Sequence, residues 1–86
     1  MIVKIRTVGV QSPRLSSPDG DGFSRLKLAD ASTIRGLIKY LDPEEPDHLA
    51  VFLNDEQVVE SRYGDTILVD GAELVLLRPI DGGKLL

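Results

Sequence analysis

The chain has 86 residues and no cysteine, so it is one small domain without disulfide bonds or metal sites held by thiolates. Fourteen acidic residues against ten basic ones give a formal net charge of −4, which disfavours binding to the phosphate backbone of nucleic acid. No apolar run is long enough for a signal peptide or a membrane span, so we expect a cytoplasmic protein.

The N-terminal third predicts two strands joined by a long connection. Residues 2–8 alternate apolar and charged side chains, with Val3 and Ile5 on one face. Residues 9–22 are rich in Gly, Pro and Ser and carry little apolar surface, so we expect a long mobile connection there. Residues 23–28 alternate again and predict a second strand beside the first.

The next segment has the apolar period of a helix. Its apolar stripe consists of Ile34, Leu37, Ile38 and Leu41. Ser32 or Thr33 can cap its N-terminus, and Pro43 ends it because the residue before a proline avoids helical geometry. Gly36 inside the helix costs about 1 kcal/mol relative to alanine, so we expect close packing at that position.

The C-terminal half predicts three further strands, over residues 49–53, 57–59 and 73–77. Asn54 and Asp55 form the turn between the first two of them. The last strand is apolar at both parities, as in a central strand covered on both faces. The order of elements predicts an α+β fold, a mixed sheet with one main helix packed across one face, in which the first and last strands are adjacent and parallel.

Strand alternation divides the apolar side chains between two faces of this sheet. It places Val3, Ile5, Val51, Leu53, Leu74 and Leu76 inward with the helix stripe. It places Phe52, Val75 and Leu77 on the open face, where they predict a partner-binding patch. The alternative is that these three are scattered surface hydrophobes, which are common.

The final strand leads into the segment Arg78-Pro79-Ile80-Asp81-Gly82-Gly83, and only Lys84, Leu85 and Leu86 follow. A glycine pair has no Cβ, so it can stay extended and enter an active site too narrow for other residues. We therefore expect a domain over residues 1–81 and a flexible tail over residues 82–86. A frayed terminus or a turn is the alternative, because Asp-Gly-Gly is common in turns.

The chain resembles the ubiquitin-like sulfur carriers, which include the small subunit of molybdopterin synthase and the thiamine-pathway carrier. The resemblance runs over nearly the whole chain and is strongest from Leu49 to Gly83. The matching features are Asn54 after an apolar strand, Asp70-Gly71-Ala72-Glu73 before the final strand, and the segment that ends at Gly83. The resemblance implies a β-grasp fold and a C-terminal glycine carboxylate that an ATP-using activating enzyme adenylates. The carboxylate then becomes a thiocarboxylate that supplies sulfur to an acceptor enzyme. By this resemblance Gly83 carries the sulfur, and Gly82 is its flexible neighbour.

The chain departs from these carriers after the second glycine. Most of them stop there, and no thiocarboxylate can form on Gly83 while its peptide bond to Lys84 is intact. Some carriers of this type are precursors that a JAMM-type zinc metalloprotease trims, so we expect Lys84, Leu85 and Leu86 to be a cleaved extension. A cloning remnant, or a chain that keeps only the fold, would also explain these residues.

The sequence contains no Walker-type loop, no nucleophile–base pair and no cluster of metal ligands, so we expect no catalytic residue, bound cofactor or metal. ATP is expected only as a substrate of the activating enzyme. His48, the single histidine, and the acidic residues 42–47 are interpreted as parts of a solvated turn. The interpretation is a carrier for molybdopterin, thiamine or other biosynthesis. A ubiquitin-like modifier conjugated through Gly83, or a non-covalent β-grasp adaptor, remains open.

Overall fold

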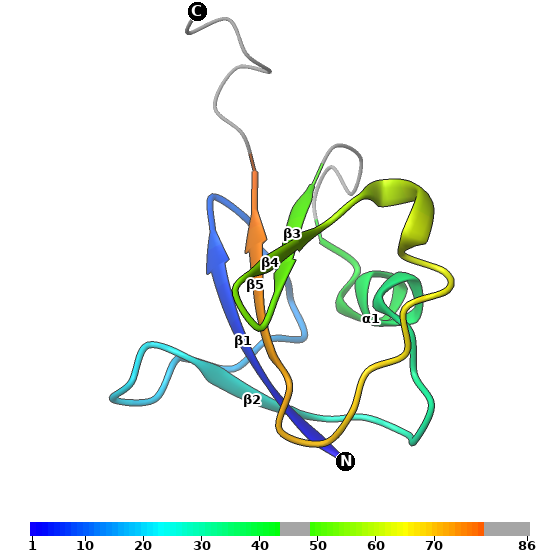
Figure 1. Cartoon of the computed structure of the whole chain (residues 1–86). Coiled ribbons are helices and arrows are strands. Elements are labelled where there is room, and N and C mark those ends of the chain that lie inside the picture. The colour runs from blue at the N-terminus through cyan, green and yellow to red at the C-terminus, as the bar shows by residue number, and fades with distance from the viewer. Residues whose placement is uncertain (44–48, 79–86) are drawn as a thin grey trace, which may run out of the picture.

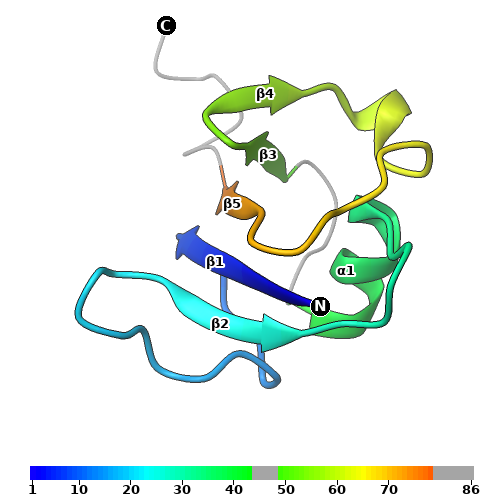
Figure 2. The same ribbon diagram turned by 60° about the horizontal axis from the view of Figure 1, so that its bottom comes forward.

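The computed structural model describes residues 1–43 and 49–78. Its sheet consists of β1 (Ile2–Val8), β2 (Ser24–Lys27), β3 (Ala50–Leu53), β4 (Glu56–Val58) and β5 (Glu73–Leu77), in the order β2-β1-β5-β3-β4 (Figure 1). Helix α1 (Ile34–Leu41) packs against one face, and a short 3₁₀ helix, η1 (Glu60–Arg62), follows β4 (Figure 2). The expected mixed sheet with one helix, typical of a β-grasp, is confirmed.

The first and last strands, β1 and β5, lie side by side at the centre of the sheet and run parallel, as predicted. The other neighbouring pairs are antiparallel. Because β1 and β5 run the same way, they end at the same edge of the domain. Arg78, the last residue that the structure describes, follows β5 at that edge.

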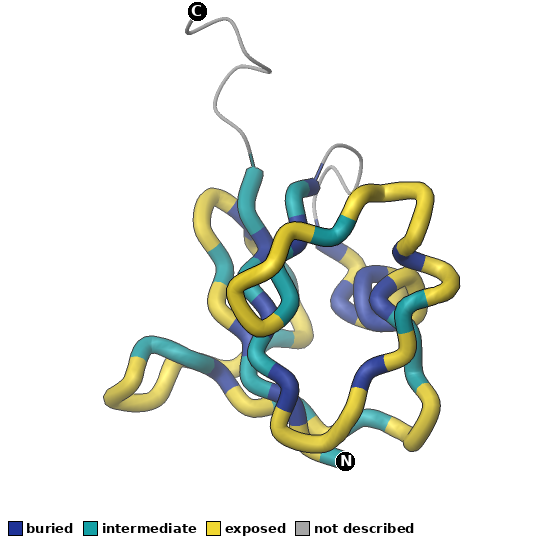
Figure 3. Tube along the Cα trace, viewed as in Figure 1, coloured by how far each residue is buried: buried dark blue, intermediate teal, exposed yellow. Residues whose placement is uncertain are grey.

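The core lies between the sheet and α1 (Figure 3). Its largest fully buried side chains are Ile5, Ile34, Leu37, Leu41, Leu74, Leu76, Val3 and Val51. Leu53 is partly buried and packs against this cluster. The predicted division of the strand residues between the two faces therefore agrees with the burial.

Helix α1 begins where the sequence supplies a cap. The Thr33 hydroxyl oxygen accepts a hydrogen bond from the Gly36 N–H at 3.1 Å, and Asp42 ends the helix in the left-handed conformation. Gly36 itself is exposed, and a Cβ built there would meet only the Thr33 hydroxyl, at 3.4 Å. The expectation of close packing at Gly36 is therefore wrong.

Loop 9–22 is attached to the rest of the domain at several points. Val10 belongs to the core, and Leu15 packs against it. The Ser12 hydroxyl donates to the Leu41 carbonyl at the end of α1, and the buried Ser24 hydroxyl donates to the Ser16 carbonyl at 2.6 Å. The expectation of a long mobile connection did not anticipate these contacts.

A two-residue turn joins β3 to β4. Asn54 and Asp55 both have positive φ, as the turn that suits a twisted hairpin requires. The Asn54 side-chain oxygen accepts from the Glu73 N–H at 3.0 Å, and the Asn54 N–H donates to the Glu73 carbonyl at 2.8 Å. Asn54 therefore joins the end of β3 to the start of β5.

Candidate functional site

The path towards the tail is anchored at the end of β5. The Arg78 N–H donates to the Val8 carbonyl at 3.0 Å, and its Nε donates to the Gly9 carbonyl at 3.0 Å. Gly9 has a φ of +70°, and a Cβ there would lie 3.5 Å from the Arg78 Cβ. The final described residue is thus held against the turn that follows β1.

The tail residues Gly82, Gly83, Lys84, Leu85 and Leu86 lie outside the described residues, as does His48. Their predicted roles stay predictions. The described part of the site therefore consists of the edge of the domain where β1 and β5 end, and of the open face of the sheet beside it.

The open face carries apolar side chains in two rows next to this edge. In the row nearest the edge, Val8 on β1 pairs with Leu77 on β5, and Leu77 pairs with Ala50 on β3. In the next row, Val75 on β5 pairs with Phe52 on β3. We call these five residues the apolar patch.

The predicted patch residues Phe52, Val75 and Leu77 are thus brought together on β3 and β5, and all three are partly exposed. Sequence reasoning missed Ala50 and Val8, although Val8 is 48% exposed. The signal for Val8 was its parity, since it follows Lys4 and Arg6 at steps of two along β1. Whether a partner binds the patch stays a prediction.

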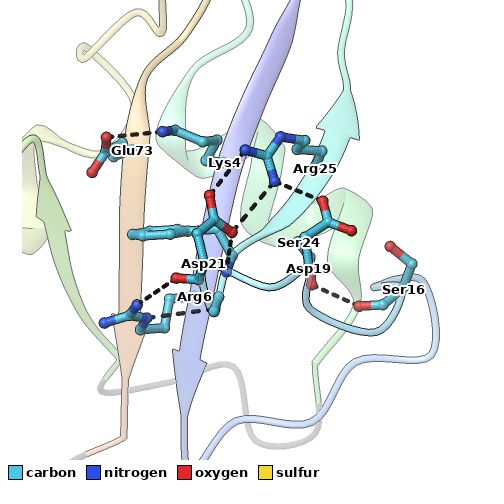
Figure 4. Close-up of polar contacts among 10 residues, drawn as sticks. Lys4, Arg6, Ser16, Asp19, Asp21, Ser24, Arg25 and Glu73 are labelled. Atoms are coloured by element: carbon cyan, nitrogen blue, oxygen red, sulfur yellow. Dashed lines mark hydrogen bonds and ion pairs between the residues drawn. The ribbon is translucent and has the colours of Figure 1, made fainter.

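Charged side chains occupy the open face farther from this edge (Figure 4). The Lys4 ammonium lies 3.1 Å from the Glu73 carboxylate, which joins β1 to β5. The Arg25 guanidinium lies 2.6 Å from Asp19 and 2.9 Å from Asp21. These ion pairs are partly or fully exposed, so we expect them to add little stability, and the two pairs of Arg25 position the loop.

The loop carboxylate of Asp21 is held in its charged form. The hydrogen bond from the Arg25 side chain, followed by that from the Phe23 N–H, lowers the pKa of Asp21 from 3.8 to about 2. The same pairing raises the pKa of Arg25. Both groups are therefore charged at neutral pH.

A cavity of about 370 Å³ lies on the helix side of the molecule, among Arg35, Lys39, Glu60 and Tyr63. Tyr63 forms part of its wall, and its hydroxyl donates to the Leu49 carbonyl at 2.8 Å. Burial, first of all, raises the pKa of Tyr63. This hydroxyl therefore stays protonated and serves the fold.

In residues 1–43 and 49–78, no three His, Cys, Asp or Glu side chains gather as a metal site would need. In the same residues, no helix has the length and hydrophobicity to cross a membrane.

Comparison with known proteins identifies the family. The model of the ThiS family matches residues 20–83. Among solved structures, SAMP1 from Haloferax volcanii is similar in fold, with a TM-score of 0.62 and 21% sequence identity over 96% of this chain and 100% of that one. A search of curated proteins gives no significant match. The matched segment holds most of the sheet and all of α1, and the chain belongs to the ThiS family of non-catalytic, ubiquitin-like sulfur carriers.

Proposed function

We propose that the chain is a sulfur-carrier precursor. Removal of Lys84, Leu85 and Leu86 exposes the Gly83 carboxylate, which is adenylated and converted to a thiocarboxylate. The observation that carries this proposal is the span of the family match, which runs to Gly83 and leaves the last three residues out. The thiocarboxylate then donates sulfur in the biosynthesis of a cofactor or another metabolite.

The first reaction is hydrolysis of the peptide bond between Gly83 and Lys84. Water adds to the Gly83 carbonyl carbon, and the amine of Lys84 leaves, so the products are a carrier ending at Gly83 and a free tripeptide. A JAMM-type metalloprotease is the proposed catalyst. Two glycines before the cut suit a narrow protease cleft because neither carries a side chain.

The second reaction activates the new carboxylate. Its oxygen attacks the α-phosphorus of ATP, pyrophosphate leaves, and an acyl-adenylate forms. Sulfide then attacks the Gly83 carbonyl carbon and AMP leaves, so that the carboxylate becomes a thiocarboxylate. Membership of the family implies an adenylating partner, which would perform the activation step.

The geometry of the open face supports binding of the adenylating enzyme there. Arg78, the last described residue, directly follows Leu77 of the apolar patch and donates its N–H to the Val8 carbonyl, so an enzyme that binds the chain at this end also meets Leu77 and Val8. The buried centre of a protein interface is more apolar than its rim, and aromatic residues such as Phe are enriched there. We propose that the patch docks the adenylating enzyme.

The test compares a chain ending at Gly83 with the full chain ending at Leu86. Each is mixed with ATP, the adenylating enzyme from the same organism and a sulfide source, and its intact mass is measured. We expect the shorter chain alone to gain the mass difference between sulfur and oxygen. A full chain that gains it with its last three residues still present contradicts the precursor role. If neither chain gains it, the carrier role fails.

The same two chains, added with ATP to cell extract, separate the carrier from a modifier. A modifier of this kind forms an amide between Gly83 and a lysine of another protein, and so adds a ladder of larger species in cell extract. Gly83→Ala in the shorter chain is the control, since its Cβ is expected to block both outcomes without loss of the fold.

A further inference from the structure

The Arg6 side chain is held in one place on the open face (Figure 4). Its Nη2 donates to the Asp21 carbonyl at 3.0 Å, and its Nε reaches the Gly22 carbonyl at 3.5 Å. Its guanidinium carbon lies 4.5 Å from the centre of the Phe23 ring. A flexible arginine is therefore fixed before any partner arrives, which lowers the entropy lost on binding.

Gly22 leaves the space that this arrangement needs. A Cβ on Gly22 would lie 2.7 Å from the Arg6 Nη2, closer than a real Cβ contact allows. The φ of Gly22 is +84°, which other residues rarely adopt. Glycine at position 22 therefore suits the positive φ of the loop and leaves free the place that the Arg6 guanidinium takes.

Arg6 differs from its charged neighbours in what it binds. Arg25 and Lys4 each face carboxylates. Within the part of the chain that the structure describes, no carboxylate lies within 4.0 Å of Arg6, and its hydrogen bonds go to neutral carbonyls. The positive charge of Arg6 is therefore available to a partner.

Arg6 also lies in the second row of the open face, because it pairs with Val75 of the apolar patch. A protein that covers the patch therefore reaches Arg6 as well. Covering an arginine without a counter-charge is costly, whereas a carboxylate can accept two parallel hydrogen bonds from its planar group.

From this placement we infer that Arg6 anchors a carboxylate of the adenylating enzyme. The enzyme presents an Asp or Glu side chain to Arg6 while its apolar residues cover Phe52 and Val75. This inference rests on the proposed function and adds the chemistry of the partner surface.

The test measures the dissociation constant, Kd, of the full chain and the adenylating enzyme from the same organism, at low and at high salt. Arg6→Gln should raise Kd about tenfold or more at low salt, the effect typical of a central arginine anchor. It should also flatten the dependence of Kd on salt, because the screened ion pair is gone. Arg6→Lys should keep part of the salt dependence but bind several-fold more weakly, since lysine lacks the planar fork.

Lys27→Gln is the matched control. It removes the same charge from an exposed residue of the neighbouring strand, where Lys27 pairs with Ile2 far from the patch. It should change Kd by less than about twofold, as expected for a peripheral charge. Thermal melting of each variant checks that the fold is intact.

Three results overturn the inference. These are an unchanged Kd for Arg6→Gln, equal weakening by Arg6→Gln and Lys27→Gln, and no measurable binding by the unsubstituted chain. A different result overturns the proposed function and leaves this inference standing. It is binding that depends on Arg6, combined with no adenylation of the chain ending at Gly83.

Discussion

At the scale of single residues, Asp21 shows how the loop before β2 depends on charge. The folded pKa of about 2 lies below the ordinary value of 3.8. The charged carboxylate therefore contributes its full stabilisation of the loop at pH values above 3.8. That contribution is lost as the pH falls through about 2. The main cause is the Arg25 side chain.

We therefore predict that Arg25→Gln raises the pKa of Asp21 towards 3.8, because the largest favourable contact of the carboxylate is removed. An NMR titration that follows the Asp21 carboxyl carbon measures it. Lys27→Gln serves as the control and should leave the pKa near 2. An equally low pKa in the Arg25→Gln protein would show that the backbone N–H of Phe23 is sufficient.

The burial of Leu76 in the core gives a second prediction for a single residue. Leu76 is fully buried, whereas its neighbour Leu77 is partly exposed on the open face. Leu76→Ala should lower the free energy of unfolding by about 2 to 5 kcal/mol, because it removes packed methyl groups and leaves a cavity. Leu77→Ala is the matched control and should cost much less. Chemical denaturation measures both, and equal losses would place the two side chains on the same face.

At the scale of elements, the strands and the helix could be predicted because their causes are local. Alternation along β1 and the stripe from Ile34 to Leu41 are visible in the sequence, and Thr33 was one of two expected caps. Loop 9–22 was different. Its anchor from Ser12 to Leu41 joins residues 29 positions apart, and no local pattern signals such a contact.

Helix α1 gives the prediction at this scale. Because Gly36 is exposed and a Cβ there meets only the Thr33 hydroxyl, at 3.4 Å, Gly36→Ala should stabilise the protein by about 0.5 to 1 kcal/mol. Thermal melting measures the change. The control is Gly22→Ala, where the φ of +84° predicts destabilisation. A lower melting temperature for Gly36→Ala would show that the Thr33 cap tolerates no added methyl group.

At the scale of the whole molecule, the sequence predicted the two faces of the sheet but only part of the open one. Phe52, Val75 and Leu77 followed from the parity of β3 and β5. The position of Arg6 over Phe23 did not follow. It depends on how the chain returns from loop 9–22 into β2, and on the space left by Gly22.

The apolar patch predicts a separation of stability from activity. Phe52→Asp should lower the melting temperature far less than Leu76→Ala, because Phe52 is only partly buried. It should weaken adenylation strongly, since a charge replaces an apolar contact at the interface. Gln57→Asp adds the same charge beside Phe52, outside the patch, and should change adenylation much less. Melting curves and initial adenylation rates check this, and an unfolded Phe52→Asp protein would assign Phe52 to the core.

The proposed carrier function requires a working form of this protein that ends at Gly83. Its most direct test is the intact mass of the untagged protein isolated from its own cells. We predict a chain that lacks Lys84, Leu85 and Leu86, with a fraction heavier by the difference between sulfur and oxygen. A chain that still ends at Leu86 in actively growing cells, with no sulfur-bearing fraction, would contradict the account.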